Sequence, residues 1–342
     1  TKKKRKKKPK KKKKNVKKGK KEKRKTKTKK LKVKETNERK DDLAVSVTSD
    51  SPRDSRITND ATQANQKQTP LVFWHGLGDS CCNPLSLGGF TNFVKEQIPG
   101  VYINSLKIGD TMIQEVEDGY FMNTNDQVRV ACEIIRNDSA LSGGYHALGF
   151  SQGSQFLRAV AQRCPDPPMI NLVSLGGQHQ GVFGFPKCPG DNSTLCEYVR
   201  RLLNIGAYWD AVQNHLVPAQ YWHDPFHRET YAAKSIFLAD INNERYKNET
   251  YKQNLLKLKN FVLVLYEEDS VVDPRNSSWF GYYPDNDDKT IVPLQQQKIY
   301  TEDWIGLKQL DESGRLVFLS TPGDHLQMDK QWFIDNIIKY LK

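Results

Sequence analysis

The sequence predicts an α/β fold, in which a mostly parallel sheet carries helices on both faces. Continuous apolar runs at 71–74, 145–150 and 169–175 are typical of strands whose two faces are both covered. Segments with apolar residues at helical spacing lie between these runs. The third observation is Gly-Phe-Ser-Gln-Gly at 149–153, which stands between a predicted strand and a predicted helix.

The pentapeptide at 149–153 matches the G-x-S-x-G pattern of a nucleophile elbow. Glycines at its two ends allow a sharp turn with close backbone contacts, and this turn lifts the Ser151 hydroxyl above the sheet. The hydroxyl would then lie at the N-terminal end of a helix, where developing negative charge is stabilised. One face of that helix is predicted to carry Phe156, Leu157, Val160, Ala161 and Cys164. An ordinary strand-to-helix turn is the alternative interpretation.

Residues 1–68 are predicted to be a disordered, Lys-rich tail followed by a polar linker. Residues 1–40 contain 26 Lys and Arg and three Glu, and such a block repels itself and buries too little apolar surface to fold. The remainder holds 27 basic and 37 acidic residues, so the folded part is acidic. No aromatic residue precedes Phe73, so the tail lacks a platform for stacking bases. For the folded domain as well, we expect no nucleic-acid partner.

Cysteines and glycosylation motifs bear on the cellular compartment. No window of 18 or more apolar residues is present, so no transmembrane helix is predicted, and no secretory signal peptide is visible. Six cysteines within 81–196 are compatible with three disulfides and an oxidising compartment, with six reduced thiols as the alternative. The Asn-x-Ser/Thr pattern gives four candidate glycosylation sites, at Asn137, Asn192, Asn248 and Asn276.

The folded domain is predicted to span 69–342 and to begin with the strand at 71–74. This strand leads into a glycine-rich turn, His-Gly-Leu-Gly-Asp at 75–79, which can aim backbone N–H groups at a reacting carbonyl. In an α/β-hydrolase this loop supplies half of the oxyanion hole, so we expect the backbone N–H groups of Leu77 and Gln152 to be the two donors. A plain turn between a strand and a helix is the alternative.

The middle of the domain contains a predicted insertion. A strand at 101–106 and a helix at 124–136, capped by Asn123 or Thr124, come first. At about 178–260 the alternation of strands and helices lapses, and apolar residues appear mostly at helical spacing: Tyr198, Leu202, Leu203, Tyr208, Trp209, Val212, Leu216 and Trp222. We interpret this segment as a helical lid whose apolar face lines an acyl groove. A helical subdomain that packs only its own core is the alternative.

A serine hydroxyl needs a positioned base to act as a nucleophile, and in α/β-hydrolases an acid and then the base follow it along the chain. His325 follows the last predicted strand, 316–319, and precedes the final predicted helix, 329–341, so it is the expected base. The preceding strand is followed by two candidate acids, and the residues alone leave the choice open between Asp269 and Asp273. Neither metal-ligand spacing nor a nucleotide-binding glycine pattern is present, so we expect no metal and no cofactor.

Six longer segments carry a resemblance to a known family. They are His-Gly-Leu-Gly-Asp-Ser-Cys-Cys-Asn-Pro at 75–84, Gly-Phe-Ser-Gln-Gly at 149–153, Gly-Gly-Gln-His-Gln-Gly-Val at 176–182, Tyr-Trp-His-Asp-Pro at 221–225, Phe-Leu-Ala-Asp-Ile-Asn at 237–242 and Gly-Asp-His-Leu-Gln at 323–327. Together, in one unbroken order over 70–342, they resemble the lysosomal palmitoyl-protein thioesterases. The resemblance implies an α/β-hydrolase with an inserted lid that removes long-chain acyl groups, chiefly palmitate, from protein cysteines.

The resemblance also implies roles for single residues. Ser151 is the implied nucleophile, Asp269 the acid and His325 the base, and S-palmitoylated proteins and peptides are the implied substrates. The implied disulfides are Cys81–Cys82, Cys132–Cys164 and Cys188–Cys196. Asn248 matches a glycosylation site of the family. Two features depart from it: Ser154 replaces a usual glycine, and the Lys-rich tail stands in place of a signal peptide.

Two other functions fit the same motifs. A serine lipase or esterase would use the same residues on oxygen esters, and a lipid-binding protein would use the groove without catalysis. Turnover of a palmitoyl thioester relative to a palmitoyl oxygen ester separates the first function from a thioesterase. Labelling of Ser151 by a fluorophosphonate separates the second, because only an activated serine reacts.

Overall fold

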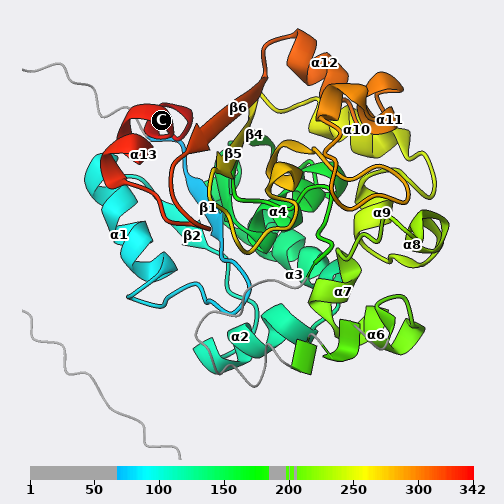
Figure 1. Ribbon diagram of the computed structural model, residues 1–342. Helices are drawn as coiled ribbons and strands as arrows, with labels where there is room; N and C mark the ends of the chain where they lie inside the picture. The colour runs from blue at the N-terminus through cyan, green and yellow to red at the C-terminus, as the bar shows by residue number, and fades with distance from the viewer. Residues whose placement is uncertain (1–67, 185–197, 200, 204–205) are drawn as a thin grey trace, which may run out of the picture. The chain divides into compact units, whose positions relative to one another are not determined.

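The computed structural model describes residues 68–184, 198–199, 201–203 and 206–342 (Figure 1). Of the predicted tail and linker, only Gln68 falls within these ranges. The described residues form a six-stranded sheet in the order β2-β1-β3-β4-β5-β6, and every adjacent pair is parallel. The strands are β1 (Leu71–Trp74), β2 (Ile103–Ser105), β3 (Tyr145–Phe150), β4 (Met169–Leu175), β5 (Asn260–Tyr266) and β6 (Leu316–Thr321). The predicted α/β class with a mostly parallel sheet is confirmed.

Helices cover both faces of this sheet. On one face lie α1 (Leu87–Gln97) and α13 (Lys330–Asn336), and on the other lie α3 (Thr124–Asn137) and α4 (Gln152–Arg163) (Figure 1). The other helices are α2 (Met112–Phe121), α6 (Asp210–His215), α7 (Val217–Gln220), α8 (Arg228–Lys234), α9 (Leu238–Ile241), α10 (Glu249–Leu255), α11 (Lys298–Thr301) and α12 (Leu307–Glu312), with 3₁₀ turns at Ser139–Leu141, Arg275–Trp279, Leu294–Gln296 and Ile338–Tyr340. No helix in the described ranges is long and apolar enough to cross a membrane.

Each face of the sheet has its own apolar core, and β1 shows how one strand serves both. Leu71 and Phe73 pack in the core that includes residues of α1 and α13. Val72 and Trp74 pack in the larger core that includes α3, α4 and the insertion. Successive strand residues point to opposite faces, so an uninterrupted apolar run is what a strand with helices on both sides requires.

Element boundaries differ from the predictions mainly at the two ends of the domain. The strand predicted at 101–106 is shorter, since β2 contains three residues. The final helix predicted over 329–341 is wrong as one continuous helix, because α13 ends at Asn336 and a 3₁₀ turn completes the segment. That tighter turn still buries Ile338 and Leu341 against the sheet. The apolar pattern is therefore satisfied without a regular helix, which is why periodicity alone misplaced its end.

The insertion, where described, consists of the short helices α6 to α10, each four to seven residues long. It covers the outer side of α4, so all residues of α4 from Gln152 to Gln162 are buried. The prediction after Ser151 described one buried apolar face, whereas in the structure the other side of this helix is buried as well. Its polar side is not solvated, because Arg158 and Gln162 both donate hydrogen bonds to the backbone carbonyl of Ile241.

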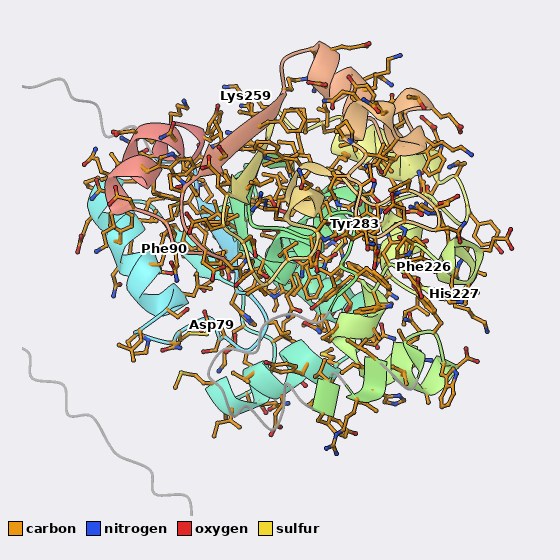
Figure 2. The ribbon with its side chains drawn as sticks, in the orientation of Figure 1. Asp79, Phe90, Phe226, His227, Lys259 and Tyr283 are labelled. Carbon is orange, nitrogen blue, oxygen red and sulfur yellow. A yellow bond between two sulfur atoms is a disulfide. The ribbon has the colours of Figure 1, made fainter. Side chains whose placement is uncertain are left out.

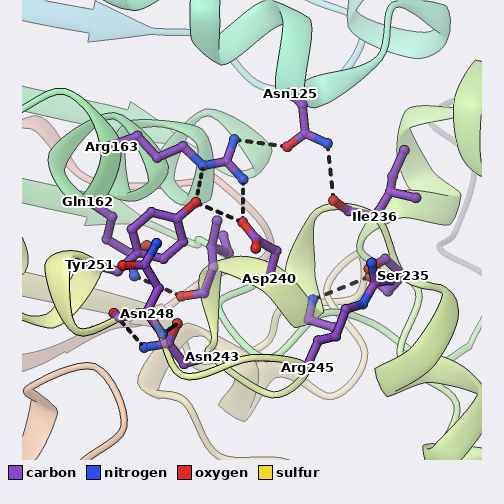
Figure 3. Close-up of polar contacts among 12 residues, drawn as sticks. Asn125, Gln162, Arg163, Ser235, Ile236, Asp240, Asn243, Arg245, Asn248 and Tyr251 are labelled. Atoms are coloured by element: carbon purple, nitrogen blue, oxygen red, sulfur yellow. Dashed lines mark hydrogen bonds and ion pairs between the residues drawn. The ribbon is translucent and has the colours of Figure 1, made fainter.

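The guanidinium of Arg163 also joins the insertion to the body of the domain (Figure 3). Arg163, the last residue of α4, donates to the side-chain oxygen of Asn125 on α3 at 2.8 Å and to the hydroxyl of Tyr251 on α10 at 3.1 Å. It also pairs with the carboxylate of Asp240 on α9 at 2.8 Å. Tyr251 donates to the same carboxylate at 3.0 Å. These contacts fix α9 and α10 against the helix that follows Ser151.

Candidate active site

Ser151 has a strained backbone at the end of β3. Its φ of 51° and ψ of −123° lie in a region that residues with a side chain rarely occupy. A Cβ on Gly149 would lie 2.5 Å from the Cα of Ser154, and a Cβ on Gly153 would collide with the backbone carbonyl of Trp74. Both glycines are therefore needed for close backbone approach, in agreement with the prediction of a nucleophile elbow.

Ser154, which stands where the family usually has glycine, fits within α4. Its position is helical and fully buried, so a side chain there requires no unusual backbone dihedrals. The Ser154 hydroxyl donates to the carbonyl oxygen of Gly149 at 2.7 Å. This hydrogen bond satisfies the buried hydroxyl and ties the first turn of α4 to the strand that precedes the elbow.

The two candidate acids after β5 have different partners. Nδ1 of His325 lies 2.7 Å from Oδ2 of Asp269. The other oxygen of Asp269 accepts the backbone N–H groups of Val271 and Val272, at 2.9 and 2.8 Å. Asp273 instead accepts the hydroxyl of Tyr283 at 2.7 Å. Of the two carboxylates, Asp269 is thus the one in contact with the candidate base, and backbone donors fix its orientation.

Asp324 joins the loop that carries His325 to the loop that carries Asp269. Its Oδ1 accepts the backbone N–H groups of Ser270 and of His325, both at 2.7 Å. Its Oδ2 accepts the hydroxyl of Ser270 at 2.8 Å. No role was predicted for Asp324 from the sequence. A carboxylate directly before a candidate base, on a loop after a strand, was the signal that could have found it.

A cavity of about 510 Å³ contains both Ser151 and His325 in its wall. Figure 2 marks Asp79, after β1, and Phe90, on α1, two other residues of this wall. Most of the lining is apolar, and the insertion contributes Val182, Val199, Leu203, Pro218, Tyr221 and Trp222. Within the described part of the chain the Ser151 hydroxyl makes no hydrogen bond, so Ser151 and His325 share this cavity without being bonded to each other. Such contacts are often long in the absence of substrate.

Some apolar residues of the insertion fit the interpretation as a lid, and others fit a subdomain that packs its own core. Leu203 and Trp222 line the cavity, as a lid would, and also belong to the main core. Val212 and Leu216 are buried in the main core, as in a subdomain that packs its own interior. Trp209 does neither, because its side chain is 60% exposed. Helical spacing alone could not separate these three fates, since the short helices α6 and α7 change direction between them.

Besides Ser151 and His325, the mostly apolar wall contains five polar side chains: Asp79, Ser86, Tyr120, Gln178 and Tyr221. Burial raises the pKa of both tyrosines, so their hydroxyls stay protonated and can donate. The Tyr221 hydroxyl donates to the side-chain oxygen of Gln152 at 3.2 Å. Gln152 in turn donates to the carbonyl of Gly119 at 3.2 Å. The residue after Ser151 is therefore held through its side chain by α2 and by the insertion.

The two expected oxyanion donors lie on segments that meet at Ser151. Gln152 occupies the first position of α4, where a backbone N–H has no acceptor within the helix. Leu77 lines the cavity, in a turn closed by the N–H of Asp79 on the carbonyl of Gly76 at 3.3 Å. A Cβ on Gly76 would lie 3.3 Å from the Cβ of Ser151, so the turn packs directly against the elbow.

Two of the three disulfides implied by the resemblance lie within the described residues. Cys81 is bonded to Cys82, and Cys132 on α3 is bonded to Cys164 directly after α4. The pair Cys188–Cys196 lies outside the described residues, as does the candidate glycosylation site Asn192. No cysteine in the described ranges is free, which favours the disulfide interpretation over six reduced thiols.

The other candidate glycosylation sites differ in accessibility. Asn137, at the end of α3, and Asn248, at the start of α10, are exposed. Asn276 is half-buried within its 3₁₀ turn. Among the side chains that the structure describes, no group of three or more potential ligands is arranged to hold a metal ion.

Comparison with known proteins identifies the family of this chain. The family model described as palmitoyl protein thioesterase matches residues 70–325. The chain belongs to this family. It is 57% identical over 273 residues to palmitoyl-protein thioesterase 1 of Caenorhabditis elegans, covering 80% of this chain and 91% of that protein. It is 28% identical over 254 residues to lysosomal thioesterase PPT2 of Homo sapiens, covering 72% of this chain and 78% of that protein.

Among solved structures, the chain is similar to Bacillus licheniformis lipase BlEst2, with a TM-score of 0.43 and 11% identity, covering 81% of this chain and 94% of that chain. Membership of the palmitoyl protein thioesterase family makes this protein a thioesterase, which acts on acyl thioesters. The resemblance inferred from the six sequence segments is thereby confirmed.

Proposed function

We propose that this thioesterase removes palmitoyl and similar long-chain acyl groups from cysteines of proteins and peptides, with Ser151 as the nucleophile. The observation that carries the proposal is the hydrogen bond between Asp269 and His325 beside a mostly apolar cavity that also contains Ser151. The apolar wall suits a long hydrocarbon chain, and the few polar groups around Ser151 suit the thioester carbonyl.

In the proposed reaction, His325 takes the proton of Ser151 as its oxygen attacks the thioester carbon. Asp269 holds Nδ1 of the imidazole, so that Nε2 is free to accept this proton, and stabilises the imidazolium that forms. The oxyanion of the tetrahedral intermediate accepts hydrogen bonds from the backbone N–H groups of Leu77 and Gln152. The carbon–sulfur bond breaks, and the cysteine sulfur takes the proton from the imidazolium of His325 and leaves as a thiol. Water, activated by the same imidazole, then releases the fatty acid from Ser151.

The same proposal places the protein in the lysosome. The supporting observations are the name of the human relative, a lysosomal thioesterase, and disulfides that suit an oxidising secretory route. Glycosylation of Asn137 and Asn248 fits this route, because both side chains are exposed.

The test is Ser151→Ala, with Ser142→Ala, an exposed serine before β3, as the matched control. Turnover of a palmitoyl-cysteine peptide should fall at least about 10⁴-fold in the first variant and stay unchanged in the second. A palmitoyl oxygen ester of the same peptide is measured in parallel. Faster cleavage of the oxygen ester would assign the site to a lipase or esterase, and undiminished turnover by Ser151→Ala would remove the nucleophile assignment.

A further inference from the structure

Glu115 is a buried carboxylate that the proposed reaction does not use. It lies on α2, and its side chain is fully buried although its helix neighbours Gln114 and Glu117 are exposed. Burial of a carboxylate is costly unless other groups compensate for the lost water. Its partners therefore indicate what keeps it inside.

Those partners lie at the two ends of one loop. Oε1 of Glu115 accepts the backbone N–H of Cys81 at 2.8 Å and lies 3.5 Å from Nε2 of His75. Nδ1 of His75 is 2.8 Å from the carbonyl oxygen of Gly76. One carboxylate oxygen thus bridges the first and last residues of the 75–81 loop, and Leu77 lies between these two anchors.

The hydrogen bond of His75 to Gly76 fixes which imidazole nitrogen faces Glu115. A carbonyl oxygen only accepts hydrogen bonds, so the imidazole nitrogen that contacts Gly76 must carry a proton. The other nitrogen, Nε2, therefore faces the carboxylate of Glu115, 3.5 Å from Oε1.

The helix that carries Glu115 also contacts the other parts of the proposed oxyanion hole. Gly78 has a φ of +80°, and a Cβ there would lie 3.1 Å from the hydroxyl of Tyr120 on α2. The carbonyl of Gly119, also on α2, accepts the side chain of Gln152. This helix therefore touches both segments whose backbone N–H groups face the developing oxyanion.

We propose that Glu115 is a positioning residue that holds the backbone N–H of Leu77 in place by anchoring both ends of the 75–81 loop. Oε2 of Glu115 has no hydrogen-bond partner among the described residues, so these anchoring contacts all run through Oε1. The inference rests on the proposed function, because it assigns Leu77 as an oxyanion donor. Since such donors act mainly in the transition state, a loosened loop should lower kcat and leave substrate binding unchanged.

The test compares two substitutions of similar shape, Glu115→Met and Glu115→Gln. Methionine fills the space but offers no acceptor to the N–H of Cys81 and no partner to His75. Glutamine keeps an oxygen at the position of Oε1, which can still accept the N–H of Cys81 and still lies beside His75. Glu117→Met, an exposed carboxylate two residues further along α2, is the control for the helix itself.

We expect Glu115→Met to lower kcat by about 10- to 100-fold, less than the loss of a complete oxyanion donor, with KM within about twofold. Affinity for a long-chain trifluoromethyl ketone, which forms a tetrahedral adduct with the serine, should fall by the same factor as kcat/KM. Affinity for palmitate, which forms no adduct, should not change. Glu115→Gln and Glu117→Met should stay within about threefold of the wild type.

Three results would overturn the proposal. The first is equal activity of Glu115→Met and Glu115→Gln, which would reduce the role of Glu115 to filling space. The second is an equal loss of affinity for palmitate and for the ketone, the signature of general damage. If Glu115→Met does not fold, His75→Phe removes the other half of the bridge while retaining a ring, and wild-type kcat in that variant is the third.

The parent function is measured first, on the wild-type protein. Turnover of palmitoyl-cysteine peptide and fluorophosphonate labelling of Ser151 must both be present. Their absence overturns the proposed function and the positioning role together. Their presence, combined with an unaffected Glu115→Met variant, overturns the positioning role alone.

Discussion

The carboxyl edge of the sheet and the interior behind α4 both contain ionisable side chains, but they use them differently. At the edge, Asp269 and His325 lie beside a cavity. Behind α4, a group that we term the Arg158 cluster (Arg158, His179 and Asn242) is fully buried. Arg158 donates to the carbonyl of His179 at 3.2 Å and to the side chain of Asn242 at 2.8 Å.

The comparison shows that a displaced pKa does not by itself mark a functional group in this protein. Burial, helped by the charge of Arg158, holds the pKa of His179 well below its usual range. Burial, with the charge of Arg228, does the same for His223. Neither of these histidines lines the cavity. Their displaced pKa values report desolvation, so geometry beside a cavity is the better guide to chemistry here.

The largest effect should come from the edge. Asp269→Asn should lower kcat on the order of 10⁴-fold, because the amide can stabilise neither the tautomer nor the charge of His325. Its unfolding free energy should change much less. Steady-state kinetics and urea denaturation of the same preparation measure both quantities.

Asp273→Asn is the matched control, because Asp273 follows the same strand and bonds to Tyr283 instead. We expect its kcat to remain within about threefold of the wild type. If Asp273→Asn lowered kcat more than Asp269→Asn, the acid would be Asp273. The comparison between the edge and the interior would then no longer hold.

The next effect should come from the interior. Arg158→Met should lower the unfolding free energy by about 1–3 kcal/mol, because the buried side-chain oxygen of Asn242 loses its donor and the carbonyls of Ile241 and His179 each lose one of two donors. The folded fraction should keep its kcat within about threefold. Arg129→Met, an exposed arginine on α3, should cost less than about 0.5 kcal/mol. A large loss of kcat with normal stability would place Arg158 in the reaction.

The smallest effect should be the pH dependence of stability that comes from His146, near the start of β3. Burial, assisted by the charge of Lys259, lowers the pKa of His146 to about 4. In the unfolded chain a histidine takes up its proton near pH 6.5, so the unfolded state binds more protons between these values. Stability should therefore fall as pH decreases from 6.5 to 4, by at most about 1.4 kcal/mol per pH unit for this group.

His146→Gln should flatten this dependence, and urea midpoints at pH 4.5 and 6.5 compare the two proteins. An unchanged pH dependence would show that His146 contributes nothing to it. His179 and His223 have pKa values displaced in the same direction and should give part of the slope that persists in the variant.

The elements of the sheet could be predicted because local pattern and tertiary environment agree there. The apolar runs at 145–150 and 169–175 match β3 and β4 to the residue. The elbow glycines were predictable for the same reason, since a turn of that geometry leaves no space for side chains. The choice between Asp269 and Asp273 was not predictable from the residues, because both follow β5 and only loop conformation decides which one meets His325.

The roles of residues that depend on distant partners could not be predicted from the sequence pattern. Arg158 lies outside the apolar face predicted for its helix, and the insertion that buries it comes from about 80 residues further along the chain. Glu115 carried no prediction, and its partners lie more than 30 residues earlier. Periodicity describes one element at a time, whereas burial of a polar side chain is decided by the element that packs against it.

The close approach of the backbone at Gly153 predicts the effect of missense mutations at this codon. Any missense change of a glycine codon adds at least one carbon atom, and at this position that carbon would meet the carbonyls of Trp74 and His75. Every missense allele at this codon should therefore be deleterious, whatever the polarity of the new residue. The neighbouring position is permissive by contrast, because Ser154 already occupies it and forms a hydrogen bond.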